Sequence, residues 1–307
     1  MSAATKSTPR KRGNAFGFWF FQVLIRCTGL RGAYGFLHVV CLYYFLFDRE
    51  AVKSALPYIK RRFPDAGLLK RAVCVYRLFL NQGRSLIDRY VLVAGYEPFT
   101  ITFKGHKNLE ALSRDDRGFV LLTSHVGNWQ VVMSALKKLD KDVYLLMRPE
   151  DNQAVRRALK VDQGGGNIHV ITTDEHLGGV VRMMQVLAEG NIVSIMGDRG
   201  YQSDRVPISL LKQTAYLPYS AFRIAVGARC PVAVLFSAKV GSSAYEVDIA
   251  TVIHPERPRR RESLDKQWGP WVQAYADVLN NYLDLHPFQY YIFQDLWEAS
   301  DVKNETL

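Results

Sequence analysis

The sequence predicts an α/β fold in which a largely parallel central sheet is flanked by helices and preceded by an N-terminal membrane-associated helical hairpin. From residue 119 onward, short apolar runs alternate with segments of helical periodicity, which is typical of strands connected by helices. Two longer apolar runs rich in aromatic residues lie within residues 1–48. The 307 residues, 48% of them hydrophobic, can bury one large core. We therefore expect residues 1–48 to form a basic arm with membrane-associated helices and residues 49–307 to form one globular domain.

The N-terminal part begins with a basic arm. Its charged side chains are Lys6, Arg10, Lys11 and Arg12. Two apolar runs follow, residues 15–25 and 33–47, and Arg26 and Arg31 separate them. Each run is shorter than the roughly 20 residues that cross a bilayer, and no small-residue cleavage site follows either of them. We expect a pair of helices that lie in, or dip into, the cytoplasmic leaflet, with a helical hairpin buried against the globular domain as the alternative.

Net charge limits the classes of partner, and the cysteine pattern bears on disulfides and metal sites. The chain has 40 Lys and Arg against 29 Asp and Glu, a net charge of +11, which favours anionic lipid, an acidic carrier protein or nucleic acid. No nucleic-acid-binding motif is recognised, so we expect no nucleic-acid partner. The cysteines lie far apart among apolar neighbours without a Cys-x-x-Cys pair, at positions 27, 41, 74 and 230. We expect them to be reduced core residues and expect no metal site.

The globular part begins with a mixed-charge helical region at residues 49–95, after which strands and helices alternate. The buried strands are expected at residues 119–122, 143–147, 168–172, 192–196 and 232–236. The helices are expected at residues 128–139, 151–161, 175–189 and 218–227, with a final amphipathic helix at 263–285. In such sheets, reactive groups collect where strands end and loops lead into helices.

The segment after the strand at residues 119–122 carries the strongest candidate for chemistry. It reads Thr-Ser-His-Val-Gly-Asn-Trp-Gln over residues 123–130. His125 lies at the strand end, Gly127 permits close approach of a substrate, and the helix expected to open near Asn128 has free N–H groups that can bind a developing oxyanion. We therefore expect His125 to be a reactive residue and not a packing residue.

Four blocks in this order resemble a known family. They are His-Val-Gly-Asn-Trp-Gln at 125–130, Met-Arg-Pro-Glu-Asp-Asn at 147–152, Met-Gly-Asp-Arg at 196–199, and the segment 207–225. The chain resembles the lysophospholipid acyltransferase superfamily and, within it, the lipid A late (lauroyl/myristoyl) acyltransferase-like family and its predicted acyltransferase branch. The resemblance covers most of the chain, and four ordered blocks are far more specific than one.

The resemblance implies an acyltransferase domain. His125 would act as general base while a hydroxyl or amine of a lipid-like acceptor attacks an acyl carrier protein or coenzyme A thioester, with no covalent enzyme intermediate. Beyond this thioester co-substrate we expect no cofactor. The implied partners are membrane lipid and an acyl carrier protein, at the cytoplasmic face of the cell inner membrane.

The resemblance also implies a set of substrate-binding residues. These are Gly127, Asn128, Trp129, Arg148, Asn152, Asp198, Arg199 and Pro218. Arg148 and Arg199 can bind phosphate or carboxylate through the guanidinium group, although salt bridges at strand ends are the alternative. Asp198 either binds the acceptor or holds Arg199. The acyl pocket is expected between the sheet and residues 206–222.

Gln130 departs from the family pattern, which has Asp or Glu at that position. The amide oxygen of Gln130 can accept a hydrogen bond from the His125 ring, but it cannot neutralise the imidazolium. We therefore expect His125 and Gln130 to form the catalytic pair, with another carboxylate such as Asp198 reducing the loss if it lies close. The alternative function is a non-catalytic lipid or acyl-carrier binding relative of the family.

Overall fold

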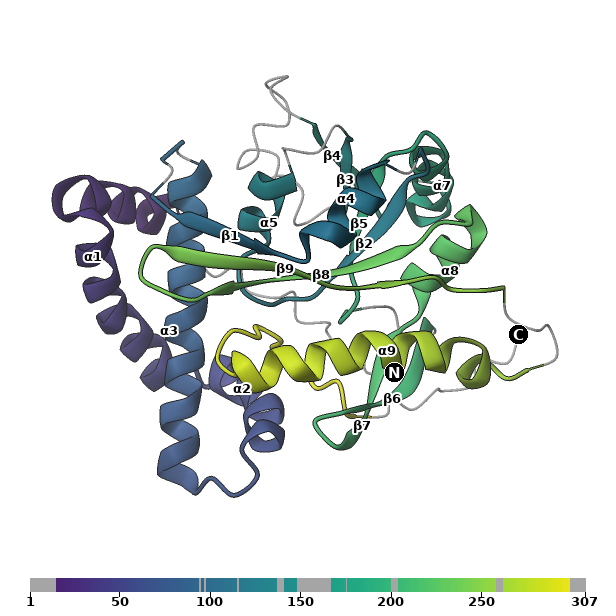
Figure 1. Ribbon diagram of the computed structural model, residues 1–307. Coiled ribbons are helices and arrows are strands. Elements are labelled where there is room, and N and C mark those ends of the chain that lie inside the picture. Colours follow the sequence, from purple (N-terminus) through teal and green to yellow (C-terminus); the bar gives the residue numbers. More distant parts are fainter. Residues whose placement is uncertain are drawn as a thin grey trace, which may run out of the picture.

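A computed structural model of the chain describes residues 15–93, 95–96, 98–114, 116–136, 141–147, 167–174, 176–199, 204–257 and 262–298 (Figure 1). Its centre is a seven-stranded sheet in the order β1-β9-β8-β2-β5-β3-β4. The strands are β1 (Thr100–Lys104), β2 (Phe119–Thr123), β3 (Val143–Met147), β4 (Ile168–Thr172), β5 (Ile192–Met196), β8 (Val232–Lys239) and β9 (Ala244–Ile253). The five strands from β8 to β4 are parallel, β9 is antiparallel to β8, and β1 is parallel to β9. The largely parallel sheet is therefore confirmed.

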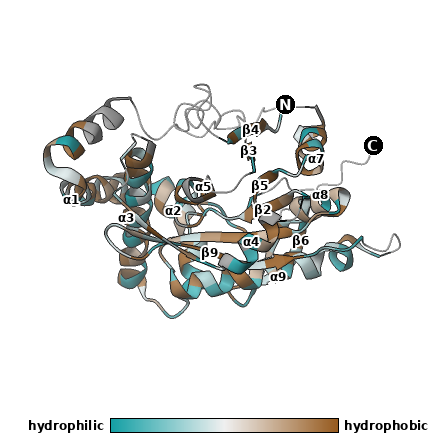
Figure 2. Cartoon of the chain, turned by 45° about the horizontal axis from the view of Figure 1, so that its top comes forward, coloured by the Kyte–Doolittle hydropathy of each residue, from teal (hydrophilic) through white to brown (hydrophobic). Residues whose placement is uncertain are grey.

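Helices cover both faces of this sheet. They are α1 (Ala15–Phe47), α2 (Arg49–Arg62), α3 (Leu68–Val93), α4 (His106–Arg114), α5 (Trp129–Leu136), α7 (Val180–Ala188), α8 (Ser220–Ala228) and α9 (Leu264–Leu285), with a 3-10 turn at His176–Gly179 before α7. An antiparallel hairpin of β6 (Arg205–Leu210) and β7 (Gln213–Pro218) lies beside α9. The central strands are mostly hydrophobic, whereas the helices show both kinds of residue (Figure 2).

The core divides at the sheet because neighbouring side chains of a strand point to opposite faces. Phe119 and Leu121 of β2 pack with residues of α4 and α5 on one face. Val120 and Leu122 pack on the other face with residues of α8, α9 and the β6–β7 hairpin. The molecule thus has helical layers on both sides of a sheet that is buried on both faces, as its near-continuous apolar strands predict.

The N-terminal helix α1 bends at Gly29, whose φ of 68° lies outside the helical region. The predicted break between the two apolar runs is thus placed between Arg26 and Arg31. Val23–Phe47 forms one stretch of 25 residues that is long and apolar enough to cross a membrane. This differs from the expectation of two runs that are each too short, because the apolar stretch extends on both sides of the kink at Gly29 and includes Arg26 and Arg31. The inner side of this stretch is buried among the residues of the core.

A buried carboxylate ties α1 to the sheet. Asp88 of α3 is fully buried and accepts a hydrogen bond from the Nζ of Lys239 at the end of β8, at 2.6 Å. The hydroxyl groups of Tyr34 in α1 and Tyr245 in β9 also donate to Asp88. We call these four residues the Asp88 cluster. It joins α1, α3, β8 and β9 close to the strand ends that form the site.

Candidate active site

Two neighbouring strands bring His125 and Asp198 together. In the parallel pair of β2 and β5, Thr123 lies opposite Met196, and His125 and Asp198 are each the second residue after these strand ends. The Nδ1 of His125 lies 2.7 Å from Oδ1 of Asp198. The backbone N–H of His125 donates to Oδ2 of Asp198 at 2.8 Å. Asp198 therefore holds both the ring and the backbone of His125.

The charge state of Asp198 determines the tautomer of His125. Burial of Asp198, whose side chain is 0% exposed, would by itself raise the pKa of the carboxyl group. The charge and hydrogen bonds of His125, helped by Arg199, outweigh burial and hold that pKa below its ordinary value. An ionised carboxylate only accepts hydrogen bonds, so Nδ1 carries the hydrogen and Nε2 is the basic nitrogen. The His125 side chain is 24% exposed, so the ring is open to a substrate.

Gly127 fixes the turn after His125 because no larger residue fits. Its φ is +53°, and a Cβ atom would lie 1.8 Å from the carbonyl oxygen of Ser237 in β8. The hydroxyl of Ser85 in α3 donates to the Gly127 carbonyl at 2.9 Å. The group that approaches Gly127 closely in the structure is therefore the backbone of β8, whereas the prediction named a substrate.

Asn128 caps α5 and uses the polar groups of the turn. Its backbone N–H donates to Oγ of Ser237 at 2.9 Å, and its Oδ1 accepts from the backbone N–H of Gln130 at 3.2 Å. Its Nδ2 donates to the carbonyl of Ser85 at 3.3 Å. The N–H groups of residues 128 and 130, expected to be free for an oxyanion, are therefore already bonded, because Ser237 and the Asn128 side chain satisfy them.

A segment from the end of the described chain braces the loop from the opposite side. The N–H of Tyr291 donates to the carbonyl of His125 at 2.7 Å, and the N–H of Gly127 donates to the carbonyl of Gln289 at 2.9 Å. The side-chain amide of Gln289 pairs in turn with both backbone groups of Lys239, at 2.8 Å and 2.9 Å. We call residues 289–291 the C-terminal strap. It fixes the loop that carries His125 to the end of β8.

Tyr275 of α9 holds the end of β2 from the face of the sheet that packs on α9. Its hydroxyl donates to the carbonyl of Thr123 at 3.1 Å and shares a short hydrogen bond with Oγ of Ser124. The N–H of Gly197 donates to the same carbonyl at 2.8 Å. Both strand ends next to His125 and Asp198 are therefore held by buried hydrogen bonds.

Gln130 lies in α5 and makes none of the expected contacts. It is 4% exposed, and neither of its side-chain amide atoms has a hydrogen-bond partner. The predicted hydrogen bond from the His125 ring to Gln130 is therefore wrong. The reason is that Asp198 binds both the ring and the backbone of His125 and takes the Nδ1 position.

The other predicted site residues are more scattered. Trp129 begins α5, and the Arg89 guanidinium lies 5.1 Å from the centre of its ring. Arg199 is exposed and follows Asp198 directly. Pro218 is buried in the hairpin opposite Arg205, outside the hydrogen-bonded group around His125. The predicted residues Arg148 and Asn152, and the helix expected at residues 151–161, lie outside the described residues.

Sequence reasoning missed Ser237, Ser85, Tyr275 and the bracing role of the C-terminal strap. Ser237 lies in β8, which neighbours β2, so the order of the strands would have pointed to it. In the described parts of the chain, no group of three or more His, Cys, Asp or Glu residues is placed to hold a metal ion.

Comparison with known proteins gives two findings. Residues 9–299 match the family described as bacterial lipid A biosynthesis acyltransferase. Among solved structures, the chain is similar to the crystal structure of the 1-acyl-sn-glycerophosphate (LPA) acyltransferase PlsC from Thermotoga maritima, with 10% sequence identity and a TM-score of 0.40. That similarity covers 82% of this chain and 98% of the other. No curated protein matches the sequence.

Proposed function

The chain belongs to the bacterial lipid A biosynthesis acyltransferase family, and we propose that it moves a fatty acyl group from a carrier-protein or coenzyme A thioester to a lipid-like acceptor. The family makes it an acyltransferase that acts on lipid substrates. The observation that carries the finer proposal is the contact of His125 with the ionised, buried carboxylate of Asp198. This pair has the arrangement of a general base and its orienting group.

In the proposed reaction, Nε2 of His125 takes a proton from a hydroxyl or amine of the acceptor as that group attacks the thioester carbonyl. The tetrahedral intermediate then expels the thiolate, which receives the proton back from the imidazolium. Asp198 stabilises the imidazolium and keeps Nε2 directed away from Oδ1. The acyl thioester is the co-substrate, and this chemistry needs no further cofactor.

Arg199 is the proposed anion-binding residue within the described chain. Its side chain is exposed directly beside the catalytic carboxylate, and a guanidinium group binds phosphate bidentately. Phosphate occurs both on lipid headgroups and on the phosphopantetheine arm of either donor. We propose that Arg148 and Asn152 also bind substrate. Gly127 and Asn128 are buried and would act indirectly, by holding the loop of His125 against β8, and Trp129 would act at the start of α5.

Location at a membrane is proposed from charge and from α1. Val23–Phe47 is apolar enough to enter a bilayer, and the net charge of +11 favours an anionic surface and an acidic carrier protein. Thioester donors are cytoplasmic compounds, so the proposed position is the cytoplasmic face of the inner membrane.

The non-catalytic alternative depended on the absence of a carboxylate at residue 130. Asp198 supplies a carboxylate to the His125 ring from β5 instead, so that absence does not remove the orienting group. The geometry therefore supports catalysis over simple lipid or carrier binding.

The proposal is tested with the purified full-length protein. It is incubated with acyl carrier protein and coenzyme A thioesters of several chain lengths and a total lipid extract, and products are identified by mass spectrometry. We expect lipids heavier by one acyl group, formed by the wild type and not by His125→Ala. The matched control is His169→Ala. His169 lies on β4, and its Nε2 also pairs with an aspartate, at 3.4 Å from Oδ2 of Asp142. Full activity of His125→Ala would contradict the proposed mechanism.

A further inference from the structure

Two neighbouring tyrosines differ in one respect that points to a ligand. Tyr58 and Tyr290 are both fully buried, and their rings meet edge to face with centres 5.2 Å apart. The hydroxyl of Tyr58 donates to the carbonyl of Pro287 at 2.7 Å. The hydroxyl of Tyr290 has no hydrogen-bond partner. Buried polar groups are nearly always paired, so an unpaired buried hydroxyl requires an explanation.

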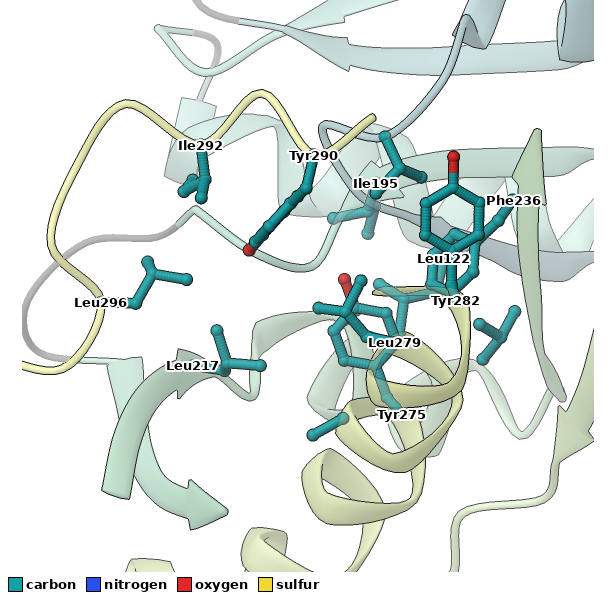
Figure 3. Packing of buried hydrophobic residues seen from close by; sticks show 14 of the residues in the cluster. Leu122, Ile195, Leu217, Phe236, Tyr275, Leu279, Tyr282, Tyr290, Ile292 and Leu296 are labelled. Carbon is teal, nitrogen blue, oxygen red and sulfur yellow. The ribbon is translucent and has the colours of Figure 1, made fainter. Parts of the chain in front are cut away.

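The Tyr290 hydroxyl lies in a mostly apolar cluster. Figure 3 shows the ring projecting from the chain with its hydroxyl directed to the side on which Leu217 and Leu296 lie, with Ile292 and Leu279 nearby. All four of these side chains are at most 1% exposed and belong to one core cluster with Tyr290. Burial, followed by the charge on Asp198, raises the pKa of Tyr290 well above its ordinary value, so the hydroxyl remains a donor.

The position of Tyr290 connects it to the proposed reaction. Tyr290 belongs to the C-terminal strap and pairs with Val126, the residue after His125. In Figure 3 its hydroxyl is directed to the side on which Leu217 lies. Leu217 belongs to the same buried cluster and to the segment 206–222 that was predicted to line the acyl pocket. Tyr290 thus belongs both to the strap that braces the loop of the proposed general base and to the buried cluster that contains part of the segment expected to hold the acyl chain.

We propose that the Tyr290 hydroxyl donates a hydrogen bond to an oxygen atom carried on the acyl chain, so that the enzyme prefers a hydroxylated acyl donor. This inference rests on the proposed function. The ligand atom is a neutral acceptor, because the hydroxyl lies in a mostly apolar cluster and the negative charge of Asp198 is close enough to affect it. A site built to bond a substrate hydroxyl discriminates against the analogue that lacks it, because the buried partner is then left unpaired.

The test compares coenzyme A thioesters of one chain length, one unsubstituted and others carrying a single hydroxyl at successive positions. We expect the wild-type protein to use one hydroxylated donor with a higher kcat/KM than the unsubstituted one. We expect Tyr290→Phe to reduce that ratio roughly 10-fold, the scale of one neutral hydrogen bond. Tyr290→Phe should keep its thermal stability, because it deletes a hydroxyl that no protein group satisfies.

Tyr58→Phe is the matched control, since it deletes a paired hydroxyl from the neighbouring ring. It should lose stability and keep the donor ratio. The proposal is overturned if the wild type shows no preference, or if Tyr290→Phe leaves the ratio unchanged. Equal loss of activity toward all donors also overturns it, because the hydroxyl would then act on the thioester and not on the chain. A stability loss without a change in ratio indicates a buried water as the partner and overturns it as well.

A second measurement separates this inference from the proposed function. Free hydroxylated and unsubstituted fatty acids are compared as competitors of a bound fluorescent fatty acid, in wild type and Tyr290→Phe. If no donor supports transfer but the hydroxylated competitor binds more tightly only in the wild type, the proposed function fails and the preference stands. If transfer occurs without that preference, the proposed function stands and this inference fails.

Discussion

At the scale of single residues, the two oxygens of Asp198 have different partners and therefore different consequences. Oδ2 accepts from the backbone N–H of His125, which cannot change, while Oδ1 faces Nδ1 of the ring, which can exchange its hydrogen. The backbone contact thus fixes the orientation of the carboxyl group. Any replacement for Asp198 must satisfy the backbone donor first.

Asp198→Asn should reverse the tautomer of His125. The amide oxygen of asparagine will face the backbone N–H, so its NH2 group will face Nδ1 and force the hydrogen onto Nε2. A similar change in the serine protease triad lowers turnover by about 10⁴, and we expect a fall in kcat of about 10³ to 10⁴ with little change in KM. Single-turnover kinetics measures it, with Asp142→Asn at the exposed His169 pair as the control. A loss below 10-fold would contradict the role of Asp198.

The lowered pKa of Asp198 also makes stability depend on pH. Because the folded state holds the carboxyl group below its ordinary value of 3.8, the carboxylate stabilises the fold above that pH. This contribution is lost as the pH falls through the lower folded-state value. The stability advantage of the wild type over Asp198→Asn should therefore be largest at neutral pH and shrink below about pH 4. Denaturant unfolding of both proteins at pH 7 and pH 3 in one detergent measures it, and an advantage that grows in acid would contradict the assignment.

Gln130→Glu should not improve the enzyme, although it restores the family pattern. Asp198 already occupies Nδ1 of His125, and the Gln130 side chain is buried without partners, so a carboxylate there would be buried unpaired. We expect no rise in kcat and a lower melting temperature. Gln130→Met, which removes both unpaired polar atoms, should melt at or above the wild-type temperature. A rise in kcat for Gln130→Glu would show that the ring can turn from Asp198 to residue 130.

At the scale of elements, strands that are apolar on both faces were predictable and strands with one apolar face were not. The predicted bounds of β3, β4 and β5 are confirmed. Among these strands β5 is buried along most of its length, and buried strands read as nearly continuous apolar runs. In β6 and β9, buried residues alternate with less buried ones, so no continuous run marks them. Strand β1 also lacks a continuous apolar run, because none of its residues is buried, and the sequence did not predict it.

In the candidate site, too, the local sequence predicts single residues but not the contacts that depend on the order of the strands. His125 follows a recognisable strand, so the sequence predicts it. Its contact with Asp198 depends on β5 being the neighbour of β2, and the strand order is not written in the local pattern. The bracing role of the strap at residues 289–291 was missed for the same reason, because its partners lie in a loop far earlier in the chain.

The Asp88 cluster is expected to stabilise the docking of α1 on the sheet. Lys239 is largely buried, and burial lowers its pKa while Asp88 opposes that shift. Asp88→Asn would leave this ammonium without its counter-charge, which typically costs about 3–5 kcal/mol for a buried pair. We expect a correspondingly lower free energy of unfolding. Glu50→Gln, at the exposed pair with Lys53, should change it by less than about 1 kcal/mol. Equal effects of the two substitutions would contradict a structural role for the cluster.

At the scale of the whole molecule, the side formed by α1 and α3 exposes large apolar side chains to solvent. Figure 1 shows these two helices side by side at one end of the sheet, away from α7. Exposed apolar side chains on them are Val39, Leu42, Tyr43, Leu46 and Phe47 of α1 and Leu68, Leu69 and Val73 of α3. Lys70 and Arg71 follow directly. Apolar residues beside basic ones are typical of a surface that binds anionic lipid.

Replacing Leu68 and Leu69 together by Glu should weaken binding to anionic vesicles at least 10-fold. Both residues are more than 80% exposed, at 85% and 86%, so the change should leave folding intact. The matched control is the exposed pair Val180 and Val181 at the start of α7, also replaced by Glu. Vesicle sedimentation measures both variants. If the α7 variant loses as much binding as the α3 variant, the membrane surface is not confined to the α1 and α3 side.

The C-terminal strap has a consequence for biosynthesis. The ribosome makes α1 first and residues 289–291 only after every strand of the sheet, and folding during synthesis proceeds from the N-terminus. A nascent chain can therefore be held at a bilayer by α1 while the loop of His125 still lacks its brace. A stop codon between α9 and Gln289 would leave the proposed membrane helix and the complete sheet in place but would remove the brace from the loop of His125. Translation thus completes the proposed membrane helix before it completes the segment that braces the proposed general base.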